Sequence, residues 1–93
     1  MINILAPIRS VNIPFIEDKV SASVQIKHTL SEAEELKDTI KPYDALLEAG
    51  DVLCSAYRTM EAIIKEEGFN CNVQDILDMI GTKNSIRGYY GDG

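Results

Sequence analysis

Four carboxylates in the middle of the chain have a spacing that could do chemistry. Glu32 and Glu35 are three residues apart, and so are Glu48 and Asp51. Side chains three apart on an α-helix lie about 60° from each other, so each pair would point to one side of its helix. A turn at Pro42 could fold the two helices together and bring the pairs face to face. We therefore expect one site built from four carboxylate groups.

Four carboxylates that lie close together repel each other unless a multivalent cation neutralises them or some of them hold protons. A site made only of oxygen ligands suits Mg²⁺, with Mn²⁺ as a second possibility. Such cations keep bound waters and also bind substrate phosphates, which points to chemistry on a nucleoside polyphosphate. The simpler interpretation is a solvated acidic surface, because single acidic pairs are common on exposed helices. Two pairs in succession favour the metal site.

The same segments resemble a known family. Glu32-x-x-Glu35, twelve intervening residues and then Glu48-x-x-Asp51 resemble the ExxE and ExxD motifs of the MazG-like, all-α nucleoside triphosphate pyrophosphohydrolases. The segment "LLEAGDVLCSAYRTMEAI" resembles that family's ExxD motif and the long apolar helix after it. The segment "VQDILDMIGTKNSIRGYY" resembles its closing helix and Lys/Asn/Arg segment. The resemblance covers about residues 26–90.

The resemblance implies a Mg²⁺-dependent enzyme that converts an NTP or dNTP to the monophosphate and pyrophosphate. Its metal ligands and catalytic groups would be Glu32, Glu35, Glu48 and Asp51. Cationic and amide donors are also needed on the phosphates, and the C-terminal segment offers Lys83, Asn84 and Arg87. Tyr89 and its neighbour Tyr90 would stack on the base or cover a subunit interface.

Three further residues are weaker candidates for a role at this site. Lys27 and Arg58 could contact phosphate, and His28 shares a helical face with Glu32 and Glu35. For the C-terminal residues, the simpler interpretation is a solvated, charged tail.

The chain around these residues reads as helical. The two prolines before Phe15 predict an irregular arm over residues 1–15. Residues 17–29 fit a strand or a helix, and we favour a helix because a lone strand would have no partner. Helices are then expected over 31–41, 43–67 and 73–80, and their predicted ends are Pro42, Gly68 and Gly81. We therefore expect one all-α domain over residues 1–93, a small MazG-like bundle of about four helices.

Self-association is expected from the size and the apolar pattern of the chain. A domain of 93 residues buries only about 60–65% of the surface of its unfolded chain. Apolar residues occur nearly all round the predicted helix between Val52 and Ile64, which should make it the buried centre of the fold. We expect a homodimer or homotetramer with the site near a subunit interface.

The charge and composition of the chain argue against several classes of function. The net charge of −6 argues against binding nucleic acid or an anionic membrane. No leader or membrane-length apolar run opens the chain, and the two cysteines show no metal-binding spacing, so a reduced cytoplasmic protein is expected. The alternative function is a non-catalytic, small acidic helical module that binds nucleotide or inhibits a basic protein. Such a module would spread its acidic residues along a face, whereas here they cluster.

Overall fold

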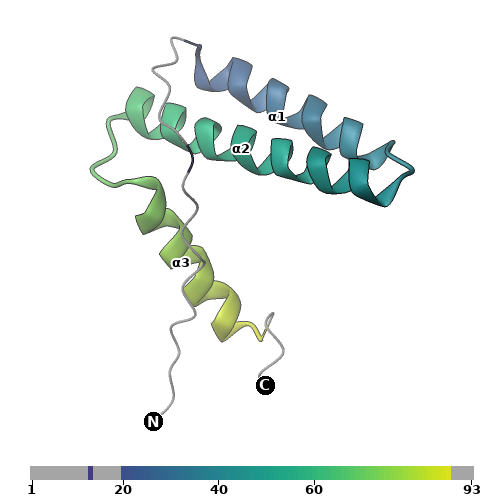
Figure 1. Cartoon of the computed structure of the whole chain (residues 1–93). Helices are drawn as coiled ribbons and strands as arrows, with labels where there is room; N and C mark the ends of the chain where they lie inside the picture. The colour runs from purple at the N-terminus through teal and green to yellow at the C-terminus, as the bar shows by residue number, and fades with distance from the viewer. Residues whose placement is uncertain (1–12, 14–19, 89–93) are drawn as a thin grey trace. The chain divides into compact units, whose positions relative to one another are not determined.

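The computed structural model of the chain describes residue 13 and residues 20–88. These residues form three α-helices and no strand: α1 (Ala22–Lys37), α2 (Pro42–Glu67) and α3 (Val73–Ile86) (Figure 1). The predicted all-α class is confirmed for this part of the chain. There are three helices here instead of about four, because residues 22–37 form one continuous helix. The predicted arm over residues 1–15 lies, apart from Ile13, outside the described residues.

α1 begins with a side-chain cap and ends before the proline. The Ser21 hydroxyl accepts a hydrogen bond from the Val24 N–H at 3.3 Å, as helix N-caps commonly do. The helix ends at Lys37, four residues before the predicted end at Lys41. A residue that precedes proline is driven to an extended conformation, and Lys41 has φ −83° and ψ 132°. The chain therefore leaves the helix early enough to turn before Pro42.

α2 has nearly the predicted bounds. Pro42 lies in its first turn, where a missing N–H costs nothing. The helix ends at Gly68, whose φ of 67° and ψ of 29° lie in the left-handed region that glycine adopts without strain. The predicted C-cap at Gly68 is confirmed.

α3 begins where the sequence predicts and ends later. The Asn72 side chain accepts from the Asp75 N–H at 2.8 Å, and the Asp75 carboxylate accepts from the Asn72 N–H at 2.9 Å. This reciprocal capping box fixes the start of the helix. The predicted stop at Gly81 is wrong, because the helix continues to Ile86 and Gly81 is buried within it. Glycine costs a helix interior only about 1 kcal/mol relative to alanine, and no proline follows to end it.

The described residues fall into two units, which we describe separately. One contains α1 and α2, which lie side by side and antiparallel as a hairpin (Figure 1). The other begins at Cys71 and contains α3.

Hydroxyl groups join the two helices of the hairpin. The Thr29 Oγ1 atom lies 2.8 Å from Ser55 Oγ and 3.0 Å from Thr59 Oγ1, and we call these three residues the hydroxyl seam. In α1 and α2, the only buried residues are Gln25 and Ser55, both polar. The most buried positions of the hairpin are therefore polar.

Two large apolar side chains of α2 lie on its other side. Leu53 and Leu46 come two and nine residues before Ser55, which places them about 160° and 180° around the helix from the contact with α1. Leu46 is 67% exposed and Leu53 is 50% exposed. The expectation that α2 forms a buried centre is therefore not met within one chain, because its one buried residue is Ser55.

Candidate metal centre

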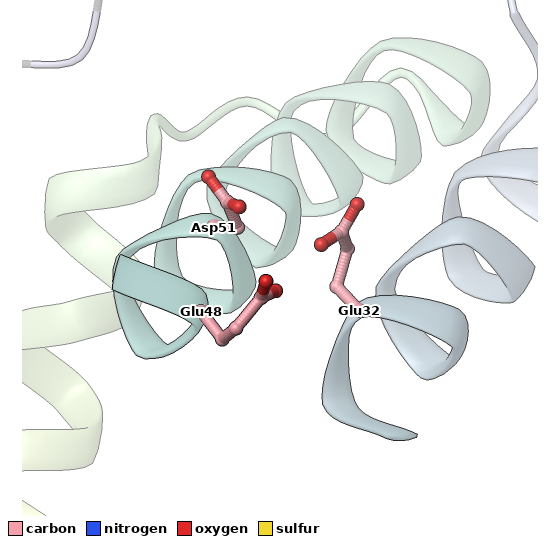
Figure 2. A group of neighbouring side chains, drawn as sticks. All are labelled: Glu32, Glu48 and Asp51. Atoms are coloured by element: carbon pink, nitrogen blue, oxygen red, sulfur yellow. The ribbon is translucent and has the colours of Figure 1, made fainter. Parts of the chain in front are cut away.

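Three carboxylates converge on one side of the hairpin. Glu32 comes from α1, and Glu48 and Asp51 come from α2; their side chains point toward a common space (Figure 2). One oxygen from each residue lies within 4.8 Å of the oxygens from the other two. We call these three residues the carboxylate cluster. Such a spacing allows one small cation to contact all three.

The hydroxyl seam sets the register that brings the cluster together. Glu32 follows Thr29 by three residues on α1, and Asp51 precedes Ser55 by four on α2. Residues three or four apart share a helical face. Once Thr29 meets Ser55 at 2.8 Å, the carboxylates one turn away must also face each other across the hairpin.

The surroundings of Glu32 favour its neutral form. Burial is the largest cause and raises the pKa of this carboxyl above its ordinary value of 4.5. A hydrogen bond with the Glu35 side chain, and the negative charges of Glu35 and Asp51, raise the pKa further. His28 acts in the opposite direction, since its Nε2 lies 3.4 Å from Glu32 Oε1.

Glu48 is the least satisfied member of the cluster. Burial again comes first in raising its pKa above 4.5, followed by the charges of Glu35, Asp51 and Asp44. Its Oε2 atom is buried and accepts no hydrogen bond from the described residues. Burying a carboxylate oxygen without a partner is costly. A cation in the cluster would supply the missing partner.

The negative charge of Glu35 acts on the cluster, although Glu35 is not one of the three residues whose oxygens converge. The sequence predicted it as a fourth ligand, but its oxygens are outside the set that meets within 4.8 Å. Its hydrogen bond to Glu32, and its effect on the pKa values of Glu32 and Glu48, place it beside the cluster. Asp44 also acts on Glu48 and was not predicted. Its position four residues before Glu48 was the available signal.

His28, Lys27 and Arg58, the weaker candidates, differ in whether they lie on the same helix face as the carboxylate cluster. His28 contacts Glu32, as the shared face predicted. Lys27 precedes Thr29 by two residues, which turns it about 160° away from the contact with α2. Arg58 follows Asp51 by seven residues, close to two full turns, and so lies on the face of α2 that carries Asp51.

The residues predicted to bind substrate lie in the unit that contains α3 or outside the residues that the structure describes. Lys83 and Asn84 are in the last turn of α3, and Arg87 is its C-cap. Lys83 and Arg87 share an open pocket of about 530 Å³ with Asp78, Met79, Thr82 and Ile86, and Asn84 does not line it. Tyr89 lies outside the described residues.

The chain matches no family model, no curated protein and no solved structure. In the part of the chain that the structure describes, no helix combines the length and apolar character that a membrane span requires.

Proposed function

We propose that this protein is a metal-dependent, MazG-like nucleotide pyrophosphohydrolase that converts an NTP or dNTP to the monophosphate and pyrophosphate. The observation that carries the proposal is the convergence of oxygens from Glu32, Glu48 and Asp51 within 4.8 Å. The buried, unpartnered Glu48 Oε2 gives this cluster a second feature that a solvated acidic surface would lack. The resemblance of the sequence motifs supplies the reaction.

The residues present fit a hard divalent cation. All three converging groups are carboxylates, which Mg²⁺ and Mn²⁺ prefer over nitrogen and sulfur ligands. The raised pKa values of Glu32 and Glu48 show that their negative charges are poorly compensated by the protein alone. Glu32, Glu48 and Asp51 would hold the cation. A cation there would neutralise phosphate charge and lower the pKa of water.

Glu35 is then available for proton transfer. It lies beside the cluster, but its oxygens are not among those that converge. In the proposal its carboxylate accepts a proton from the water that attacks phosphorus, while the bond from that phosphorus to the α,β-bridging oxygen breaks and the monophosphate and pyrophosphate separate. Its negative charge acts on both Glu32 and Glu48, which places this carboxylate next to the proposed cation.

Lys83, Asn84, Arg87 and Tyr89 are proposed to bind the substrate. Lys83 and Arg87 lie four residues apart and line the same pocket on α3, so two cations are presented by one surface. Charge-assisted hydrogen bonds from such groups stabilise phosphate oxygens.

The proposal includes a homodimer or homotetramer. Leu46 and Leu53 form part of an apolar stripe that α1 does not cover, and each is at least half exposed. Large exposed apolar surfaces on soluble proteins mark interaction sites. A second copy of the chain would bury this stripe, and removing its apolar surface from water would favour association.

A screen of canonical and modified NTPs and dNTPs with Mg²⁺ tests the proposed function, with pyrophosphate release as the readout. We expect at least one nucleotide to be hydrolysed, and Glu48→Gln to lower the rate by orders of magnitude. Glu67→Gln is a matched control, because Glu67 is exposed and lies at the end of α2. If wild type releases no pyrophosphate from any nucleotide, the acidic binding module becomes the better hypothesis.

A further inference from the structure

Arg58 is a cation that the hairpin leaves without a partner. It is half-buried on α2, and its Nε atom is buried without a hydrogen-bond acceptor. Within the described residues it forms no ion pair. A buried donor without an acceptor destabilises a fold. A guanidinium is the group best suited to bidentate contact with carboxylate or phosphate.

The position of Arg58 relative to the carboxylate cluster follows from α2 itself. Seven residues separate it from Asp51, which amounts to about 20° short of two full turns and about 10.5 Å along the axis. Asp51 meets Glu32 of α1 on one side of the hairpin. Arg58 therefore lies on that same side, two turns further toward the C-terminus of α2.

We propose that Arg58 is a substrate-binding residue that donates to a non-bridging phosphate oxygen of a substrate held at the carboxylate cluster. The inference rests on the proposed function, because it requires an anion that a cation anchors at the cluster. A phosphate chain anchored there extends several ångströms, and the Arg58 side chain can extend along the helix toward it. The ligand class is a polyphosphate, either that of a nucleoside triphosphate or inorganic tripolyphosphate.

Two other cations on the hairpin provide a comparison. Lys65 follows Arg58 by a further seven residues, so it shares the face but lies about 10.5 Å beyond it. It is exposed, as expected of a cation that only solvent contacts. Lys27 points away from α2, as its phase relative to Thr29 requires. Among these three, only Arg58 combines the right face, proximity to the cluster and a buried unpartnered donor.

The test measures two affinities of the full-length chain. Binding of magnesium tripolyphosphate is measured by calorimetry, and binding of Mn²⁺ alone is measured by electron paramagnetic resonance. We expect Arg58→Gln to weaken tripolyphosphate binding by about 10- to 100-fold, the usual scale for a charge-assisted contact. Mn²⁺ affinity should stay at the wild-type value, and the melting temperature should not fall, because the folded protein loses no hydrogen bond of this donor. Arg58→Lys should be intermediate, because it keeps the charge and loses the bidentate geometry.

Lys65→Gln is the matched control and should change tripolyphosphate affinity by less than about twofold, since the charge it removes is distant and screened. Equal losses in Lys65→Gln and Arg58→Gln would show a general charge effect and overturn the inference. A parallel loss of Mn²⁺ affinity in Arg58→Gln would show a structural role and also overturn it. If wild type binds Mn²⁺ but not tripolyphosphate, or if Arg58→Gln binds tripolyphosphate like wild type, the role of Arg58 is wrong and the cation site stands. If wild type does not bind Mn²⁺, the proposed function fails as well.

Discussion

The hydroxyl oxygens of Thr29 and Ser55 lie 2.8 Å apart across the hairpin, in the place where an apolar contact would usually join two helices. Thr29 also contacts Thr59 at 3.0 Å and donates to the Gln25 carbonyl, while Thr59 donates to the Ser55 carbonyl. Three hydroxyl protons thus serve four contacts. One contact lacks a proton at any moment, so the hydroxyl seam contributes less than four full hydrogen bonds to stability.

The first prediction concerns this hydroxyl seam. Thr29→Val should destabilise the metal-free protein by about 1–2 kcal/mol, because it leaves the buried Ser55 hydroxyl without its partner across the hairpin. The double variant Thr29→Val with Ser55→Ala should lose less than the sum of the two single changes, since no hydroxyl is then stranded. Urea denaturation of the four proteins gives the coupling. Strict additivity would show that the 2.8 Å contact does not join the helices.

The second prediction concerns the start of α1. The Glu66 carboxylate accepts a hydrogen bond from the Ala22 N–H at 2.6 Å, so the end of α2 caps the beginning of α1. A negative charge at a helix N-terminus is favourable by about 0.3–1 kcal/mol. Glu66→Gln should lower the free energy of unfolding by about this amount, and added salt should reduce the difference. Glu67→Gln, one residue further along, should change neither quantity.

The third prediction concerns pH. Glu32 and Glu48 have pKa values above 4.5 in the folded protein, so the folded state binds their protons more tightly than the unfolded state. Their contribution to stability is therefore full at low pH and is lost as the pH rises from 4.5 through the raised values. Burial is the largest cause of both raised pKa values; the negative charges of Glu35, Asp51 and Asp44 add to it, and His28 opposes it at Glu32.

Melting temperatures from pH 4 upward, measured in chelator, test this sign. The stability of wild type relative to Glu48→Gln should fall as the pH rises, because the variant cannot lose that proton. With saturating Mg²⁺ the wild-type trend should reverse, since the cation requires ionised carboxylates. A wild-type advantage that grows with pH in chelator would contradict the raised pKa of Glu48.

The helix ends show what local sequence could and could not predict. Gly68 and the Asn72 cap were predictable, because a left-handed residue and an N-cap depend only on neighbouring atoms. The continuation of α3 through Gly81 was not, because the weak preference of one glycine against helix is outweighed by the residues around it. The merging of two expected helices into α1 has the same origin, since no strong breaker separates residues 29 and 31.

The sequence could predict those features of the site that depend on which residues share a helix face. Spacing alone placed Glu32, Glu48 and Asp51 on faces that could meet, and they do. It did not show that Glu35 would lie beside these three, since that depends on how the two helices are rotated against each other. The rotation is set by Thr29, Ser55 and Thr59. Their hydroxyls carry no periodic hydrophobic signal, and sequence reasoning missed them.

The fourth prediction concerns assembly. Leu53→Glu should shift the protein to a smaller species in light scattering, because it places a charge in the apolar stripe that a second copy is proposed to cover. Ile40→Glu is the matched control: Ile40 is 94% exposed, but it lies in the turn between α1 and α2. A wild-type protein that is monomeric at micromolar concentration would contradict the proposed assembly. If the Leu53→Glu variant forms an assembly of the same mass as wild type, the interface lies elsewhere on the protein.

The last prediction separates ligands from their neighbours. Glu48→Gln and Asp51→Asn each remove an oxygen that converges in the carboxylate cluster, so both should abolish the rise in melting temperature that Mn²⁺ gives wild type. Glu35→Gln removes a neighbouring charge that raises the pKa values of Glu32 and Glu48. It should leave most of the Mn²⁺-induced rise in place while pyrophosphate release falls by orders of magnitude, because the proton acceptor is lost. In chelator none of the three variants should be less stable than wild type, since each relieves repulsion. If Glu35→Gln loses the Mn²⁺ response as completely as Glu48→Gln does, Glu35 is a fourth ligand, and the proton acceptor must be another group.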